Sequence, residues 1–140
     1  MTPFSVCTSV YRKDKPEYVR QAFDSLIGQT RRPDEIVVVI DGPVPEELHS
    51  VVREYADKYP IFNIVEFKEN RGLGQAMRTA VEVAKYDIIA RMDSDDIAFR
   101  DRFEKQIAYM EAHPDCDVLG GQIAEFIDIE SNIVGKRIVP

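Results

Sequence analysis

The chain has 140 residues, of which 44% are hydrophobic and 31% charged, and its net charge is −7. This length and composition predict one folded domain over residues 1–140 and exclude a disordered chain. A nucleic-acid backbone is bound by clustered Lys and Arg side chains, and the sequence has no such cluster, so we expect no nucleic acid as a partner. An anionic ligand would need a metal ion or local hydrogen-bond donors.

The cysteines and the first ten residues indicate the cellular compartment of the protein. Cys7 and Cys116 lack the spacing of a metal site, which favours a reducing cytoplasm. Residues 1–10 lack the basic start of a signal peptide, and no apolar run approaches the roughly 18 to 20 residues that cross a bilayer. We therefore expect a cytoplasmic protein, or one held peripherally at the inner face of the membrane through regions outside this chain.

Strand and helix patterns alternate along most of the chain, which is typical of a parallel α/β sheet. The sequence predicts strands at 4–10, 35–40, 63–67 and 87–92, and helices at 16–27, 45–59, 72–85 and from about 97 to the HPD stretch at 113–115. The last helix is expected to turn Phe99 inward. After Asp115 we expect a hairpin or edge strands, with a turn at 130–132.

Polar residues follow each predicted strand, at 9–12, 41–42, 69–72 and 93–96. Ligands of open parallel sheets bind beyond the carboxyl ends of the strands. We therefore expect these four segments to lie at one ligand-binding edge.

Three carboxylates, those of Asp93, Asp95 and Asp96, follow the fourth strand. One Asp would suffice to cap the next helix, and three close carboxylates repel one another unless a cation neutralises them. Mg²⁺ and Mn²⁺ prefer oxygen ligands, and a spacing of two directs Asp93 and Asp95 to the same side of an extended segment. The sequence thus predicts a divalent metal site at Asp93 and Asp95, with helix capping as the alternative.

Other residues at this edge have two interpretations each. Asp41 is a turn residue or accepts the imide N–H of a nucleobase, and Tyr11 packs at the sheet or stacks on the base. The glycine-bearing stretch at 69–78 suits the donation of helix-start amides to an anion. Within it, Arg71 and Arg78 either contact a phosphate or base or remain solvated.

The stretches SVCTSVYRKDKPEYVRQAFDSLIGQTRRPDEIVVVIDGP (5–43) and NRGLGQAMRTAVEVAKYDIIARMDSDDIAFRDRFEKQ (70–106) resemble the family 2 nucleotide-sugar glycosyltransferases. The likeness is greatest to enzymes of bacterial capsular or exopolysaccharide synthesis. It implies a Rossmann-like GT-A fold, a three-layer α/β/α sandwich with a mostly parallel sheet. It also implies inverting, metal-assisted transfer of a sugar from a nucleoside-diphosphate sugar, here a UDP-sugar, to a glycan or lipid-linked acceptor.

The resemblance further implies roles for individual residues. Asp41 would pair with the uracil edge, Asp93 would reach the ribose or the ion, and Asp95 would be the principal ligand of Mn²⁺ or Mg²⁺. The catalytic base and the acceptor-binding half are expected beyond residue 140, so that residues 1–140 would form the donor-binding part. The nucleotide-binding residues implied are Ser9, Tyr11, Asp41, Asn70, Arg78 and Asp93.

Two other functions stay open. A nucleotidyltransferase that makes a nucleotide-sugar would also use an acidic metal site, but it would need a glycine-rich loop after the first strand, and residues 8–15 contain no glycine. The second alternative is a non-catalytic module that binds a nucleotide or a partner.

Overall fold

The computed structural model of the chain describes residues 2–119, 123–126 and 133–137. The chain divides into two compact units, residues 1–105 and 106–140. The predicted order of strands and helices is confirmed, with boundaries that differ by a few residues. In chain order the elements are β1 (Phe4–Val10), α1 (Pro16–Ile27), β2 (Glu35–Ile40), α2 (Glu46–Lys58), β3 (Phe62–Glu66), α3 (Leu73–Val83), β4 (Ile88–Arg91), α4 (Arg102–Ala112), β5 (Ile123–Phe126) and β6 (Ile133–Arg137).

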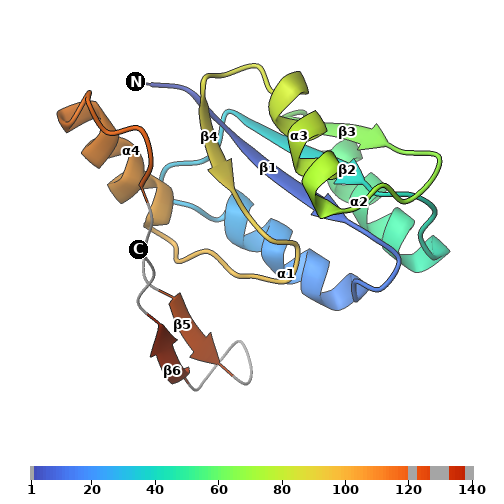
Figure 1. Cartoon of the computed structure of the whole chain (residues 1–140). Helices are drawn as coiled ribbons and strands as arrows, with labels where there is room; N and C mark the ends of the chain where they lie inside the picture. Colours follow the sequence, from blue (N-terminus) through green and yellow to red (C-terminus); the bar gives the residue numbers. More distant parts are fainter. Residues whose placement is uncertain (1, 120–122, 127–132, 138–140) are drawn as a thin grey trace. The chain divides into compact units, whose positions relative to one another are not determined.

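The first unit is built on a four-stranded parallel sheet in the order β3-β2-β1-β4 (Figure 1). The crossovers through α1 and α2 lead in one direction along the sheet, and the crossover through α3 leads back past β1. Because such crossovers are right-handed, α1 and α2 cover one face and α3 covers the other. The predicted α/β sandwich with a mostly parallel sheet is therefore confirmed.

The two central strands form the core of this unit. Every residue of β2 and all but one residue of β1 are buried, because helices cover both faces of these strands. On the face of α3, Ala76 and Ala80 pack against Cys7, Val37 and Val39. The small alanine side chains let the helix approach the sheet closely.

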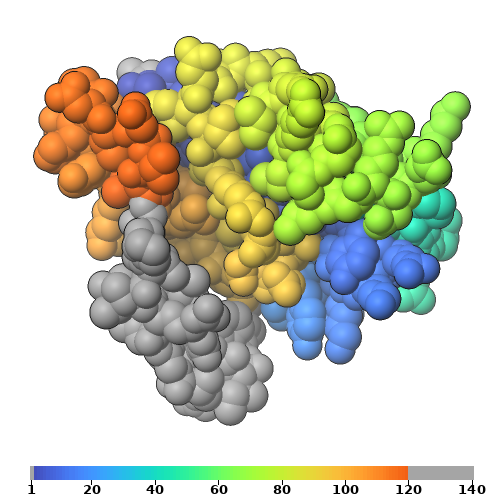
Figure 2. All heavy atoms as spheres, viewed as in Figure 1, coloured from blue at the N-terminus to red at the C-terminus, as the bar shows by residue number. Residues whose placement is uncertain are grey.

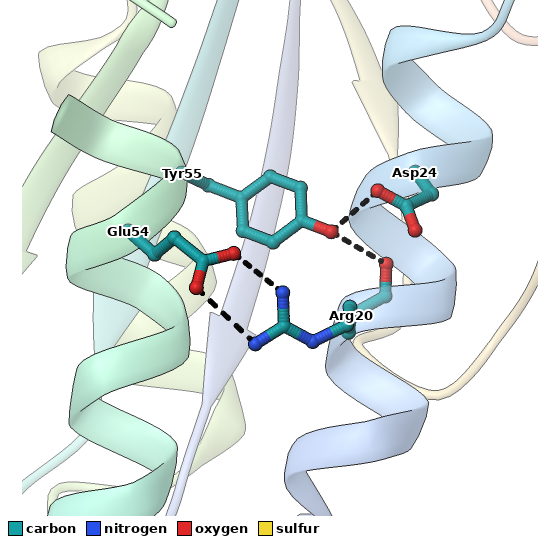
Figure 3. A network of polar contacts seen from close by, with 4 residues as sticks. All are labelled: Arg20, Asp24, Glu54 and Tyr55. Atoms are coloured by element: carbon teal, nitrogen blue, oxygen red, sulfur yellow. Dashed lines mark hydrogen bonds and ion pairs between the residues drawn. The ribbon is translucent and has the colours of Figure 1, made fainter. Parts of the chain in front are cut away.

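On the opposite face, α1 and α2 are joined by a network of polar contacts (Figure 3) and by an aromatic contact. Arg20 of α1 forms an ion pair with Glu54 of α2. The hydroxyl of Tyr55 donates to the carboxylate of Asp24, and the Tyr55 ring lies edge-on to Phe23 with centroids 5.2 Å apart. These contacts fix the two helices side by side over the sheet.

The predicted start of the fourth helix is wrong, since α4 begins at Arg102. The preceding backbone is bonded to the end of α1 instead: the N–H of Ala98 donates to Ser25 Oγ at 3.0 Å, and the Gln29 amide donates to the carbonyl of Phe99 at 2.6 Å. These tertiary bonds replace the first helical ones. The predicted inward side chain of Phe99 is also wrong, because it is 58% exposed.

In the second unit, β5 and β6 pair in the antiparallel direction, with an irregularity at Glu125 and Phe126. The predicted hairpin is confirmed, and its two strands form a sheet of their own. The predicted turn at 130–132 lies outside the described residues. Among the helices of residues 2–119, none combines the length and apolar character needed to cross a membrane.

Candidate functional site

The carboxyl ends of the parallel strands lie at one edge of the sheet, here called the carboxyl edge. The chain leaves β1 toward β2, whereas β4 lies on the other side of β1. A crevice is expected where connections diverge in this way. It is bordered by residues 11–15, the β1 loop, and by residues 93–101, the acidic loop. Figure 2 shows the blue start of α1 adjoining the gold segment after β4 on the surface.

Asp41 follows β2 directly and is buried, with 4% of its surface exposed. Its carboxylate accepts the backbone N–H groups of Arg71 at 2.7 Å and Gly72 at 3.1 Å. These charge-assisted bonds compensate for the loss of water around the carboxylate. The predicted donation of amides near the start of α3 to an anion is therefore seen, and the anion is the protein's own Asp41.

Asn70 lies beside Asp41, because the loops after β2 and β3 meet. Its side-chain amide donates to the Asp41 carbonyl at 3.2 Å. The guanidinium of Arg71 lies over the Phe67 ring, 4.8 Å from its centroid. The structure thus brings together two of the predicted nucleotide-binding residues.

At the start of the acidic loop, buried and exposed residues alternate from Met92 to Asp95, and Asp96 is exposed as well. Met92 and Ser94 are buried, whereas Asp93 and Asp95 are exposed, as the spacing of two predicts. The N–H of Asp96 donates to the Asp93 carbonyl at 3.2 Å and closes a turn. Since α4 begins further along the chain, none of the three aspartates lies at its first turn, and the helix-capping alternative is wrong.

Like charges accumulate in this loop. Partial burial of the carboxyl group and the negative charges of Asp93 and Asp95 raise the pKa of Asp96, and the positive charge of Arg102 opposes them. Asp93 has a cationic neighbour in Arg91, at 3.6 Å. A cation bound here would relieve the remaining repulsion.

Asp14 of the β1 loop is a fourth carboxylate at this site, and the sequence analysis missed it. Burial raises the pKa of Asp14, hydrogen bonds from Tyr11 and Ser94 oppose this shift, and the charges of Asp95 and Asp93 add to it. Its position just after the first strand was the available signal, because all such loops end at the carboxyl edge. Ser94 was not predicted, because the prediction was based on carboxylates and Ser94 is the uncharged residue between two of them.

The three remaining predicted nucleotide-binding residues, Ser9, Tyr11 and Arg78, differ in how exposed they are and in which element holds them. Ser9 is partly buried in β1, and Tyr11, the next residue after that strand, is 41% exposed. Arg78 lies on the exposed surface of α3, where it forms an ion pair with Glu82 at 3.0 Å. The structure therefore places Tyr11 at the carboxyl edge, and Arg78 is bonded within its own helix.

Within the described part of the chain, no three His, Cys, Asp or Glu side chains converge as a metal cage. Mg²⁺ is usually held by one or two carboxylates together with water and substrate phosphates, and it needs no such cage. The exposed carboxylates of Asp93 and Asp95 fit this manner of binding. They are the residues that would hold Mg²⁺ or Mn²⁺.

The fold and the site define an α/β protein with polar, acidic loops at the carboxyl edge of a parallel sheet. The model of glycosyl transferase family 2 matches residues 5–138, and the chain belongs to this family.

Curated relatives of the chain are named as glycosyltransferases. The chain is 47% identical over 137 residues to an uncharacterized glycosyltransferase of Haemophilus influenzae. This alignment covers 98% of this chain and 51% of that protein. It is 46% identical over 123 residues to the amylovoran biosynthesis glycosyltransferase AmsE of Erwinia amylovora, over 88% of this chain and 46% of that protein. The chain spans about half the length of the curated relatives it matches.

Two solved structures share the fold. The TarS 1–349 structure of S. aureus in complex with UDP aligns with a TM-score of 0.71 and 24% identity, over 81% of this chain and 33% of that chain. The mannosyltransferase PcManGT of Pyrobaculum calidifontis, in complex with GDP-Man and Mn²⁺, aligns with a TM-score of 0.68 and 25% identity, over 79% and 33%. Both are GT-A glycosyltransferases, which confirms the predicted fold.

Proposed function

We propose that the protein is an inverting, metal-assisted glycosyltransferase of bacterial surface polysaccharide synthesis. It transfers a sugar from a UDP-sugar to a glycan or lipid-linked acceptor, and residues 1–140 form its donor-binding part. Family membership supports the reaction class. The names of its relatives support the pathway and the donor: one belongs to amylovoran biosynthesis, and an Escherichia coli protein 35% identical over 125 residues is a UDP-Gal-dependent galactosyltransferase.

The single observation that carries the proposal is the pair of exposed carboxylates, Asp93 and Asp95, in the loop that follows β4 at the carboxyl edge. A diphosphate brings negative charge to this place, and only a cation makes its approach to two carboxylates favourable. The acidic loop therefore favours a nucleoside diphosphate bound together with a divalent metal.

The base-binding end of the site lies at the loop after β2. Each carboxylate oxygen has two acceptor positions, and the two backbone N–H groups bonded to Asp41 leave positions open. Asp41 would accept the imide N–H of uracil, with Ser9, Tyr11 and Asn70 around the nucleoside. In this arrangement the base meets an acceptor that is already fixed by the fold.

Inverting transfer is a direct displacement. The acceptor oxygen forms a bond to the anomeric carbon while the bond from that carbon to the diphosphate oxygen breaks, and the acceptor proton passes to a base. A divalent cation would stabilise the charge that develops on the departing diphosphate. Within this chain, Asp93 and Asp95 would hold and orient the metal-bound diphosphate.

Calorimetric titration of UDP in the presence and absence of Mn²⁺ tests the proposal. Asp95→Ala should weaken Mn²⁺-dependent UDP binding by at least about tenfold, or about 1.4 kcal/mol. Asp57→Ala is the matched control, because Asp57 is exposed near the end of α2, away from the carboxyl edge. Unchanged affinity in Asp95→Ala would contradict the metal assignment, and absence of UDP binding by the unmodified chain would contradict the donor.

A further inference from the structure

The carboxylate of Asp14 joins the β1 loop to the acidic loop. Its Oδ2 accepts the hydroxyl of Ser94 at 2.9 Å and the backbone N–H of Tyr11 at 3.0 Å. The N–H of Asp14 donates in turn to the Tyr11 carbonyl at 3.0 Å, so the β1 loop closes around the carboxyl group. Asp14 and Ser94 are 80 residues apart, and their contact is therefore a tertiary link between two loops of the crevice.

The orientation of Ser94 decides the orientation of its neighbours. Ser94 is 8% exposed and lies between the exposed Asp93 and Asp95. Ser94 and Asp95 are the two central residues of the turn that the bond from the Asp96 N–H to the Asp93 carbonyl closes. The bond that holds the Ser94 hydroxyl therefore also fixes this turn, in which the flanking Asp93 and Asp95 are exposed.

The same carboxylate oxygen fixes Tyr11. Because its N–H is bonded to Oδ2 of Asp14, the backbone at Tyr11 is tied to the acidic loop through a single atom. A hydrogen bond to an ionised acceptor is stronger than one between neutral groups. The bonds from Tyr11 and Ser94 accordingly oppose the rise in the pKa of Asp14 that burial and the charges of Asp95 and Asp93 cause.

We infer that Asp14 is a positioning residue for nucleotide binding: through Ser94 it holds Asp93 and Asp95 toward the metal-bound diphosphate, and through the backbone it holds Tyr11 beside the base. The identity of the ligand rests on the proposed function. The link between the loops is a property of the free protein and does not depend on the proposed function.

Two substitutions at position 14 separate hydrogen bonding from charge. Both bonds end on one oxygen, and the carbonyl oxygen of Asn has two acceptor positions, so Asp14→Asn keeps both bonds and removes the charge. Asp14→Ala removes both. With UDP and Mn²⁺ in the calorimeter, Asp14→Ala should lose about tenfold in affinity, and Asp14→Asn should recover to within about threefold of the unmodified chain. Equal losses in the two variants, or no loss in Asp14→Ala, would overturn the inference.

Ser94→Ala provides a milder variant that removes one partner of the link. In a double-mutant cycle with Asp14→Ala, the loss of UDP affinity in the double variant should be smaller than the two single losses combined, because both changes break the same bond. Additive losses would count against a link between these residues. Asp57→Ala, which lies far from both loops, should bind UDP as the unmodified chain does.

Hydrogen exchange gives a readout that needs no ligand. In the free protein, the amides of the acidic loop should exchange faster in Asp14→Ala and Ser94→Ala than in the unmodified chain, and Asp14→Asn should restore slow exchange. Unchanged exchange in Asp14→Ala would overturn the inference. If the unmodified chain binds no UDP, the proposed function fails, and the exchange rates still decide the role of Asp14.

Discussion

Gly42 and Asn70 meet backbone to backbone where the loops after β2 and β3 cross. A Cβ atom added to Gly42 would lie 2.5 Å from the backbone nitrogen of Asn70, and Gly42 has a φ of +87°. A side chain at this position is therefore disfavoured twice, by the backbone conformation and by the lack of space.

Gly42→Ala should lower the free energy of unfolding by about 3 kcal/mol, at the upper end of the usual strain for a non-glycine residue with positive φ. Urea unfolding measures this change. Gly74→Ala is the matched control, because a Cβ there meets nothing within 4 Å and the position is helical, so stability should rise by about 0.5 to 1 kcal/mol. Equal stabilities of Gly42→Ala and the unmodified chain would show that the two loops separate easily.

In the unmodified protein, two backbone N–H groups donate to separate carboxylate oxygens of Asp41. Asp41→Asn leaves a single acceptor oxygen in the side chain, and the substitution should destabilise the fold by about 1 to 3 kcal/mol. Thermal and urea unfolding without ligand isolate this structural effect from nucleotide binding. Asp57→Asn makes the same chemical change at an exposed position and should leave stability within about 0.5 kcal/mol. A stable Asp41→Asn protein would mean that the burial of this carboxylate does not depend on its charge.

Tyr55→Phe removes the hydroxyl that bonds to Asp24 and should cost about 0.5 to 1.5 kcal/mol near pH 7. Burial and the Asp24 carboxylate raise the pKa of Tyr55 above its usual value. The folded protein therefore favours the protonated phenol, and this contribution is complete below about pH 10 and is lost as the pH rises through the raised pKa. The difference in unfolding free energy between the two proteins should shrink over that alkaline range. A difference that grows there would contradict the assigned environment of Tyr55.

Cys7 should resist thiol reagents in the folded protein. Burial and the negative charge of Glu35 raise its pKa to about 11, so that little reactive thiolate forms at pH 8. Cys116 is partly exposed. With Ellman's reagent, the absorbance should correspond to one reactive thiol per native protein molecule and to two per urea-unfolded molecule. Cys7→Ser should leave the native value unchanged and Cys116→Ser should abolish it, and rapid labelling of Cys7 would contradict its burial.

The sequence predicted those elements whose pattern is local. β2 was predictable because a central parallel strand is apolar on both faces, and α1 because Pro16 starts it and its apolar residues recur at helical spacing. The start of α4 was not predictable in this way. It depends on hydrogen bonds with the side chains of Ser25, which accepts, and Gln29, which donates, and both lie more than 60 residues earlier in the chain.

The candidate site shows the same division. Asp93 and Asp95 are both exposed, as expected, but they lie in a turn in which Asp96 is exposed as well, and their spacing does not reveal this turn. The bonds that Asp41 makes to amides 30 and 31 residues later depend on how two loops cross. The partnership of Asp14 with Ser94 required the neighbouring positions of β1 and β4, which a single sequence does not reveal.

The helix α1 lies between two attachments of the acidic loop. Asp14, just before the helix, bonds to Ser94, and Gln29, just after it, bonds to Phe99. One residue added to the helix would displace its end by about 1.5 Å and rotate it by about 100°. The length of α1 thus sets the separation between the two points at which the acidic loop is attached. Insertions and deletions within this helix should consequently be selected against even where its surface is free to vary.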